Sequence, residues 1–456
     1  VQIEDVTAQW ANFTIAGPNA REVVFALGCS VDLSDDSLPH MTAACGTIAG
    51  LDTRILRVSF SGERSYEVNL PARFAAGFLE TVLQAGMEHG IAPYGIEALM
   101  VLRMEKGFLH VGSDTDGSTT PADVGWGRVA LGKKADYIGR RSLFREGNLA
   151  AGRKQLVGLE AVEPGTSMQA GAHLLRGSGR EPPAETDGWI TSACFSPTLN
   201  RHIGLAVLSD GREHGGEVVS VCDEGSHYHA RIVPTPFYDP ENQRLNPNDE
   251  SDTAPETHSA EPDEVALAMP ESNVREAAVF SGSLMRIEEQ PDTALYRLRR
   301  LPGHNEHPGA EPRLPRQVGD CSGDDPAVLC LGPGEWLLKG ASEPTRAAAA
   351  HMGGDSHATL EVSDGFTLLR LSGPASAWLL NKLGGLDFQS ARRHGEHCAR
   401  TKMQHLEVIV HYHPQLTGDG VFDLLVERSL ARYFFRLMVA SVPHAEELNR
   451  EYGEQL

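Results

Sequence analysis

The sequence lacks any long apolar run. None of its hydrophobic stretches approaches the roughly 20 residues that a transmembrane helix needs, so no membrane span is predicted. The first residues, Val1 to Asp5, contain neither a basic region nor an apolar core, which argues against a secretory signal peptide. The chain also begins without Met, and we expect a processed product or a fragment of a longer protein.

Cysteine pairs with the spacing of a metal site are missing as well. The seven cysteines are scattered, odd in number and never spaced as C-x-x-C. This argues against a disulfide framework and against a structural zinc site, and no metal site is predicted. A reducing compartment is the simplest setting, so we expect a cytoplasmic protein.

Positive charge is in short supply. The chain has 40 Lys and Arg against 62 Asp and Glu, which gives a net charge of −22 at pH 7. This balance argues against binding nucleic acid through a general electrostatic surface. Neither the G-x-S-x-G elbow of hydrolases nor the G-x-G-x-x-G turn of dinucleotide-binding proteins is found. Residues 127–133 fit the P-loop spacing, but Lys134 follows where Mg²⁺ needs a hydroxyl, so no P-loop is predicted.

The chain is long enough for two or three globular domains, with 456 residues of which 41% are hydrophobic. We predict an α+β domain over residues 1–150 and a second globular domain over 276–456. Between them, short β-like runs about 10–15 residues apart predict a small antiparallel β-barrel over 151–245. Residues 246–275 are acidic and rich in Pro and Ser, and they predict a disordered linker.

A β-hairpin is predicted over residues 54–70. Its returning strand places Tyr66, Val68 and Leu70 on one face and Glu67 on the other, because side chains alternate along a strand.

Residues 93–128 are the stretch around which the first domain is organised. A strand, turn and helix over 12–34 and an amphipathic helix over 72–86 come before it. The stretch itself begins with a Pro-Tyr-Gly turn and continues as a helix that Gly107 is placed to cap. A polar loop then leads to Trp126. A helix, a polar loop and a Trp close together indicate one wall of a ligand pocket.

The chain contains an internal repeat. The segment FTIAGPNAREVVFAL in the first domain matches LRLSGPASAWLLNKL in the last. Gly17-Pro18 falls on Gly373-Pro374 and Glu67 falls on Asp423, so both pairs lie 356 positions apart (373 − 17 and 423 − 67). One supersecondary plan therefore occurs twice, and its second copy lacks a counterpart of residues 93–128.

Four side chains near this stretch are candidates for a functional role, and each also has a purely structural explanation. Glu67 can accept two N–H donors of a planar heterocycle, but the pattern alone favours an exposed strand residue. Arg103 and Glu105 are either charges at a helix end or part of a structural ion pair. Trp126 can stack on a flat ring, although a lone Trp is more often part of a core or its rim.

Two His-x-His pairs, His227 with His229 and His411 with His413, each place two imidazoles on one strand face. No third carboxylate or cysteine ligand is evident near either pair, so metal binding is not predicted for them.

Several motifs in order resemble the aminomethyltransferase family, which includes the glycine-cleavage T-protein and the folate-binding half of heterotetrameric sarcosine oxidase alpha subunits. The motifs are RVSFSGERSYEVNLPARF, IAPYGIEALMVLRMEKGF, TTPADVGWGR, KKADYIGRRSL and GWITSACFSPTLNRHIGLAVL, within about residues 1–245. T-proteins tend to carry Arg-Asp where this chain has Leu99-Met100, which favours the sarcosine oxidase version. Residues 276–456 resemble the sarcosine oxidase gamma subunit, through VSDGFTLLRLSGPASAWLLNKLGGLDF and GVFDLLVERSLARYFFRLM.

The resemblance implies a fold and a function. The fold is an aminomethyltransferase-like folate-binding domain, incomplete at its N-terminus, then the barrel, then a degenerate second copy of the folate-domain plan. The cofactor is tetrahydrofolate, with Glu67 holding the pterin, Trp126 as the family aromatic, and Tyr94 and Arg103 as weaker transfers. No catalytic residue is assigned, because the carboxylate that assists folate chemistry in T-proteins lies upstream of Val1.

The same resemblance implies partners. A flavin-containing beta-like subunit, with FAD or FMN, would oxidise the N-methyl amine, and a small subunit would complete the complex. This chain alone is then expected to be inactive. Two alternatives stay open: a non-catalytic scaffold that docks flavin subunits, and the same chemistry on dimethylglycine or another methylated amine.

Overall fold

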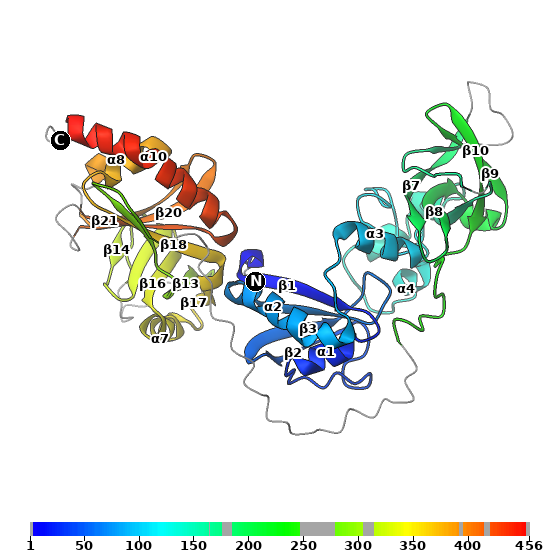
Figure 1. Cartoon of the computed structure of the whole chain (residues 1–456), viewed down its shortest axis with the longest axis horizontal. Coiled ribbons are helices and arrows are strands. Elements are labelled where there is room, and N and C mark those ends of the chain that lie inside the picture. Colours follow the sequence, from blue (N-terminus) through cyan, green and yellow to red (C-terminus); the bar gives the residue numbers. More distant parts are fainter. Residues whose placement is uncertain are drawn as a thin grey trace.

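The computed structural model describes residues 3–163, 165–175, 185–246, 279–303, 314–391, 395–414 and 420–452. The chain forms three lobes in a row, with the first sheet in the middle, the barrel at one end and the C-terminal unit at the other (Figure 1). Among the described helices, none combines the length and the apolar composition needed to cross a bilayer. The predicted linker falls almost wholly on 247–278, outside the described residues.

The middle lobe is an antiparallel sheet with two helices on one face. Its strand order is β1 (Trp10–Ala16), β4 (Ser65–Pro71), β3 (Leu51–Arg57), β2 (Thr42–Ile48). Helices α1 (Ala20–Ala26) and α2 (Ala75–Ala85) cover the face that carries Tyr66, Val68 and Leu70, which are fully buried against Phe78 and Val82. The predicted hairpin and its alternation are therefore confirmed, because β3 pairs antiparallel with β4. Short 3-10 turns η1 (Thr7–Gln9), η2 (Ala72–Phe74) and η3 (Met87–His89) flank these elements.

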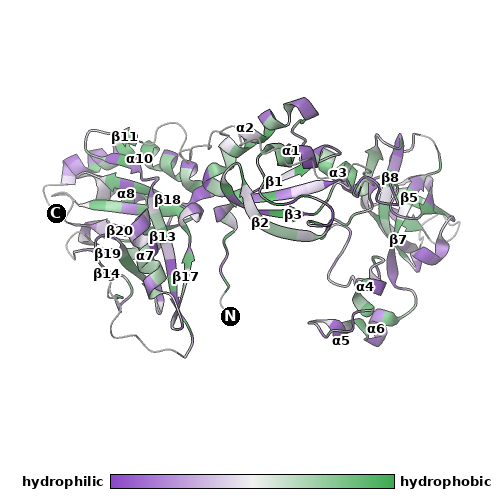
Figure 2. Ribbon diagram, turned by 90° about the horizontal axis from the view of Figure 1, so that it is seen from below, coloured by the Kyte–Doolittle hydropathy of each residue, from purple (hydrophilic) through white to green (hydrophobic). Residues whose placement is uncertain are grey.

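Helix α3 (Ile96–Glu105) follows and packs on the barrel. It ends as predicted at Gly107, which has a φ of +66°. The N–H of Gly107 bonds to the carbonyl of Met104 at 2.9 Å and the N–H of Phe108 to that of Arg103 at 2.9 Å, which is the Schellman arrangement. Three short helices come next, α4 (Gly127–Leu131), α5 (Arg140–Leu143) and α6 (Glu146–Leu149), and they lie together away from the sheets (Figure 2).

The predicted barrel is confirmed as a closed antiparallel barrel with strand order β10-β5-β8-β7-β6-β9. Closure leaves no free strand edge. The strands are β5 (Lys154–Ala161), β6 (His173–Leu175), β7 (Thr186–Ser196), β8 (Arg201–Ser209), β9 (Val218–Asp223) and β10 (Ser226–Val233), with a 3-10 turn η4 (Gly211–His214).

The segment after the barrel returns to the middle lobe. The N–H groups of Phe237 and Tyr238 bond to the carbonyl of Glu105 at 3.0 and 2.9 Å. Lys106 forms an ion pair of 2.8 Å with Asp239, and the N–H of Arg64 bonds to the carbonyl of Arg244 at 2.9 Å. This segment therefore ties α3 and the first sheet together.

The C-terminal unit contains two stacked sheets. One has the strand order β11-β12-β18-β21-β20-β19 and the other β14-β15-β16-β13-β17. The strands of the first are β11 (Val279–Ser281), β12 (Arg286–Glu289), β18 (Phe366–Ser372), β19 (His397–Met403), β20 (Leu406–His413) and β21 (Val421–Glu427). The strands of the second are β13 (Thr293–Arg300), β14 (Cys321–Ser322), β15 (Ala327–Gly332), β16 (Glu335–Ala341) and β17 (His357–Glu361). The remaining elements are α7 (Ser342–Met352), η5 (Ser363–Gly365), α8 (Ser376–Leu383), α9 (Phe388–Ala391), η6 (Arg428–Leu430) and α10 (Ala431–Tyr452).

The two units share one strand order. The sheet order β1-β4-β3-β2 of the middle lobe recurs as β18-β21-β20-β19 in the C-terminal unit. Strands β1 and β4 start at 10 and 65, and β18 and β21 start at 366 and 421, so both pairs lie 356 positions apart (366 − 10 and 421 − 65). The register agrees as well, because Thr14 faces Glu67 and Arg370 faces Asp423.

A salt bridge joins the two units. Asp364 in η5 accepts two hydrogen bonds from Arg73 in η2, at 2.6 and 3.1 Å. The backbone carbonyl of Asp364 also accepts from Arg428, at 2.7 Å, in η6. Near this contact Arg297 and Arg299 both pair with Glu4.

Candidate functional site

Glu67 lies on the face of the first sheet that α1 and α2 leave uncovered. Its neighbours Tyr66 and Val68 point into the core, so the alternation of β4 turns Glu67 the other way. Oε2 of Glu67 accepts one hydrogen bond, from Nδ2 of Asn12 at 3.3 Å. Within the described part of the chain, Glu67 takes part in no ion pair. Its carboxylate therefore has oxygen lone pairs available for N–H donors.

Asn12 is a site residue that the sequence reasoning missed. Its amide also donates to Oδ1 of Asn69 at 3.1 Å, so it links two polar side chains of the open face. The sequence could have indicated it. Side chains alternate along β1, so Asn12 lies on the sheet face away from Phe13 and Ile15, which pack in the core.

Tyr94 is the one other predicted residue that the structure brings close to Glu67. It lies in the connection between η3 and α3, and 41% of it is exposed. Partial burial, and then the negative charge of Glu67, raise the pKa of Tyr94 above its usual value. The phenol and the carboxylate therefore belong to one polar surface.

Arg103 is enclosed between α3 and the barrel. Its guanidinium pairs with Asp114 at 2.7 Å and donates to Oγ of Ser192 at 2.9 Å and to the carbonyl of Phe108 at 3.1 Å. Only 3% of Arg103 is exposed. This is the structural ion pair that the sequence left open, and no described hydrogen bond or ion pair joins Arg103 to Glu67.

Glu105 also faces the barrel. Its two carboxylate oxygens accept from Ser196 at 2.6 Å and from Thr198 at 3.0 Å. The charged end of α3 therefore orients the helix against the barrel.

Trp126 stands at the start of α4 and is 58% exposed. The backbone N–H of Trp126 donates to the carbonyl of Pro121 at 2.7 Å. This bond fixes the turn but does not involve the indole ring. None of the described hydrogen bonds or ion pairs connects Trp126 with Glu67. The sequence predicted that Trp126 and Glu67 contact one ligand. Among the described residues, no contact joins the two side chains.

Two cavities are formed by described residues of the first half of the chain. The larger, about 430 Å³, is formed between the loop at 112–124 and the barrel, next to Trp189 and Thr191. The smaller, about 150 Å³, lies where Glu63, Lys106 and Tyr238 meet. Neither is lined by Glu67, Tyr94, Arg103 or Trp126, so the Glu67 surface is an open face and not one of these two cavities.

One expectation from the sequence needs correction. No third ligand was evident near His411 and His413, but the structure places the Glu396 carboxylate beside them. Glu396 comes from the segment before β19, and strand pairing of β19 with β20 brings it to the histidines. Sequence spacing alone did not reveal this contact.

Comparisons with known proteins agree with the fold of the first half. Residues 1–134 match the GCVT N-terminal domain, and residues 154–239 match the glycine cleavage T-protein C-terminal barrel domain. The chain is 38% identical over 251 residues to the sarcosine oxidase subunit alpha of Rhizobium meliloti (strain 1021), which covers 54% of this chain and 25% of that protein. It is 32% identical over 239 residues to an aminomethyltransferase of Listeria monocytogenes serotype 4b (strain CLIP80459), covering 52% of this chain and 62% of that protein.

The chain thus matches about a quarter of the alpha subunit's length and less than two thirds of the aminomethyltransferase. Two solved structures are similar to parts of this chain. The aminomethyltransferase T of the Bartonella henselae glycine cleavage system is 22% identical, with a TM-score of 0.42, over 50% of this chain and 59% of that one. A chain of the heterotetrameric sarcosine oxidase from Corynebacterium sp. U-96 is 24% identical, with a TM-score of 0.33, over 37% of this chain and 90% of that one.

Proposed function

We propose that the first half of the chain binds tetrahydrofolate and delivers a one-carbon unit to it. This half matches the GCVT N-terminal domain, followed by the glycine cleavage T-protein C-terminal barrel domain. The observation that carries this proposal is the state of Glu67. Its carboxylate lies on an open sheet face, accepts a single hydrogen bond from Asn12 and forms no described ion pair. A pterin presents neighbouring N–H donors in one plane, and a carboxylate can accept two of them.

The C-terminal unit supports this assignment by contrast. At the position equivalent to Glu67 stands Asp423, which is fully buried and paired with Arg370 and Lys339. A carboxylate neutralised in this way has no capacity left for a ligand. We therefore propose that the ligand belongs to the first unit, and that the second is a degenerate copy of the same plan that resembles a sarcosine oxidase gamma subunit.

The other three predicted residues take different parts in this proposal. Tyr94, next to Glu67, would contact the bound ring. Arg103 would act by positioning, because its ion pair with Asp114 fixes α3 on the barrel. Trp126, with its exposed ring, would stack on another part of the ligand.

The proposed reaction needs a partner. A flavin subunit, holding FAD or FMN, would take two electrons and a proton from the N-methyl group of an amine such as sarcosine or dimethylglycine. Tetrahydrofolate would then accept the oxidised carbon as a methylene group and the amine would leave. The residues described in this chain supply a folate surface, and the flavin and small subunits are proposed partners.

Titration of 5-formyltetrahydrofolate into the purified chain, followed by calorimetry, tests this function. We expect saturable binding of one ligand per chain, and Glu67→Gln should weaken it about 10- to 100-fold, since a charged hydrogen-bond acceptor contributes roughly 1.5–3 kcal/mol. Asp52→Asn is the matched control, because Asp52 is an exposed carboxylate of β3, and its affinity should not change.

The competing function is a scaffold that docks flavin subunits without binding folate. It predicts no saturable folate binding by wild type, together with co-purification of a subunit that shows a flavin absorption spectrum.

A further inference from the structure

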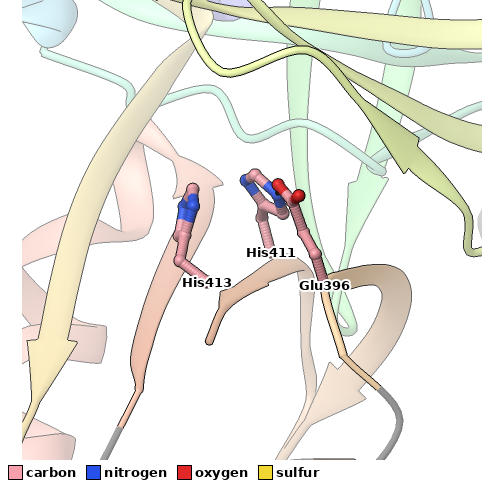
Figure 3. Close-up of side chains that lie close together, drawn as sticks. All are labelled: Glu396, His411 and His413. Carbon is pink, nitrogen blue, oxygen red and sulfur yellow. Dashed lines mark hydrogen bonds and ion pairs between the residues drawn. The ribbon is translucent and has the colours of Figure 1, made fainter. Parts of the chain in front are cut away.

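The C-terminal unit contains a polar cluster between its two sheets that the folate proposal does not use. His411 and His413 are two positions apart on β20, so both rings lie on one strand face, with ring centroids 3.8 Å apart. Glu396 joins them from the segment before β19, and the three side chains lie close together (Figure 3). His411 is completely buried, whereas Glu396 and His413 are partly exposed.

We propose that Glu396, His411 and His413 bind a divalent transition-metal ion, with Zn²⁺ as the best-suited ion. One ligand atom from each side chain lies within 4.8 Å of the other two. Around a tetrahedral zinc ion, with bonds of about 2.0–2.2 Å, neighbouring ligand atoms are about 3.4 Å apart. Small side-chain rotations therefore bring the three atoms onto one ion. Two imidazoles and a carboxylate are a donor set that zinc and related ions use.

An unsatisfied nitrogen points to the same conclusion. Nε2 of His411 donates to Oε1 of Glu396 at 2.9 Å. The other ring nitrogen, Nδ1, is buried and has no hydrogen-bond partner among the described residues. Leaving such a group unpaired costs about 1–3 kcal/mol. Because Nε2 donates, Nδ1 carries a lone pair, and coordination of an ion by Nδ1 would satisfy it.

Lys339 of the facing sheet already places a positive charge at the edge of the cluster. Its Nζ lies 3.0 Å from Nε2 of His413 and pairs with Asp423. Asp423 Oδ2 is 2.9 Å from the same His413 nitrogen. An ion bound to His413 would compete with this ammonium group. Removing the Lys339 charge should therefore tighten metal binding, while Arg370 continues to hold Asp423.

The second His-x-His pair provides a matched control. His229 on β10 contacts Oε1 of Glu163 through Nδ1 at 2.9 Å, which mimics the His411–Glu396 pair. Both partners are partly exposed, with 33% and 48% of their side chains accessible to solvent. The His229–Glu163 contact therefore has similar chemistry without enclosure between two sheets.

The test uses the full chain, stripped of metal by a chelator and then dialysed. Zn²⁺ is titrated by calorimetry, and Co²⁺ replaces it for an absorption spectrum that reports tetrahedral coordination. We expect one tight site per chain. Glu396→Gln and His411→Gln should each weaken binding by at least about tenfold, Lys339→Met should tighten it, and His229→Gln should leave it unchanged.

Circular dichroism of each variant separates loss of the site from loss of the fold. If His411→Gln does not fold, Glu396→Gln decides, because Glu396 is partly exposed and its isosteric amide preserves packing. The proposal is overturned if wild type binds no Zn²⁺ saturably. It is equally overturned if Glu396→Gln binds Zn²⁺ as tightly as wild type and the control His229→Gln do.

Discussion

Glu67 and Asp423 occupy the same position in two sheets of the same strand order, but their surroundings are opposite. Each is the third residue of its strand, β4 or β21, and each faces the equivalent residue of the neighbouring strand. Glu67 faces Thr14 and accepts one hydrogen bond from the Asn12 amide, whereas Asp423 faces Arg370, which donates to it at 2.7 and 2.9 Å. One plan thus carries an available carboxylate in the first unit and a neutralised one in the second.

Replacing Asp423 should destabilise the C-terminal unit. Asp423→Asn leaves Lys339 buried without its charged partner, and we expect a loss of about 3 kcal/mol in the free energy of unfolding. Glu67→Gln should change stability by less than about 0.5 kcal/mol, because Glu67 forms no described ion pair. Urea denaturation of both variants measures the difference, and equal losses would contradict the contrast between the two carboxylates.

The same carboxylate predicts an acid dependence. Burial alone would raise the pKa of Asp423, but hydrogen bonds from His413 and Arg370 and the charge of Lys339 outweigh it and hold the pKa well below the ordinary 3.8. A depressed pKa means that this stabilisation is present above pH 3.8 and is lost as the pH falls below that value. Unfolding measured from pH 6 to pH 3 should therefore show a steeper loss below about pH 4 for wild type than for Asp423→Asn. Parallel curves would contradict it.

Arg103 should prove essential to the packing of α3 on the barrel. Arg103→Gln leaves Asp114, which is fully buried, without its cation, and we expect a loss of about 3–5 kcal/mol. Arg128→Gln, at an exposed position of α4, is the control and should cost less than about 0.5 kcal/mol. Denaturation followed by Trp fluorescence makes the comparison. An Arg103→Gln protein as stable as wild type would refute the positioning role.

The contact between the two units should depend on Asp364. Asp364→Asn weakens the paired hydrogen bonds from Arg73, and we expect about 1 kcal/mol less attraction between the units, because Arg73 is one-third exposed. Small-angle scattering should then report a larger radius of gyration. Glu343→Gln removes an exposed ion pair within α7 and should leave the radius unchanged. Identical scattering from wild type and Asp364→Asn would show that other contacts hold the units together.

Local patterns predicted much of this fold because local forces determine it. The alternation of Tyr66, Val68 and Leu70 predicted the buried face of β4, and Gly107 marked the end of α3. The closed barrel followed from regularly spaced short strands.

Contacts between residues far apart in the sequence were not predictable in the same way. Arg103 finds Ser192 on a barrel strand, and Lys339 reaches Asp423 from the opposite sheet. Glu396 meets His411 through the pairing of β19 with β20. Each contact depends on how elements stack or how strands pair, which the spacing of residues in the sequence did not reveal. The position of Glu67 on an uncovered sheet face was not predictable either, because it depends on which elements cover each face of the sheet.

Calorimetry of folate binding by Glu67→Gln in the intact assembly tests whether Glu67 holds the pterin. The chain is purified together with whatever flavin subunits accompany it, and 5-formyltetrahydrofolate is titrated into wild-type and variant assemblies. We expect binding about 10- to 100-fold weaker in the variant, with the flavin spectrum and subunit composition unchanged. An affinity equal to that of the wild-type assembly would show that Glu67 does not hold the pterin.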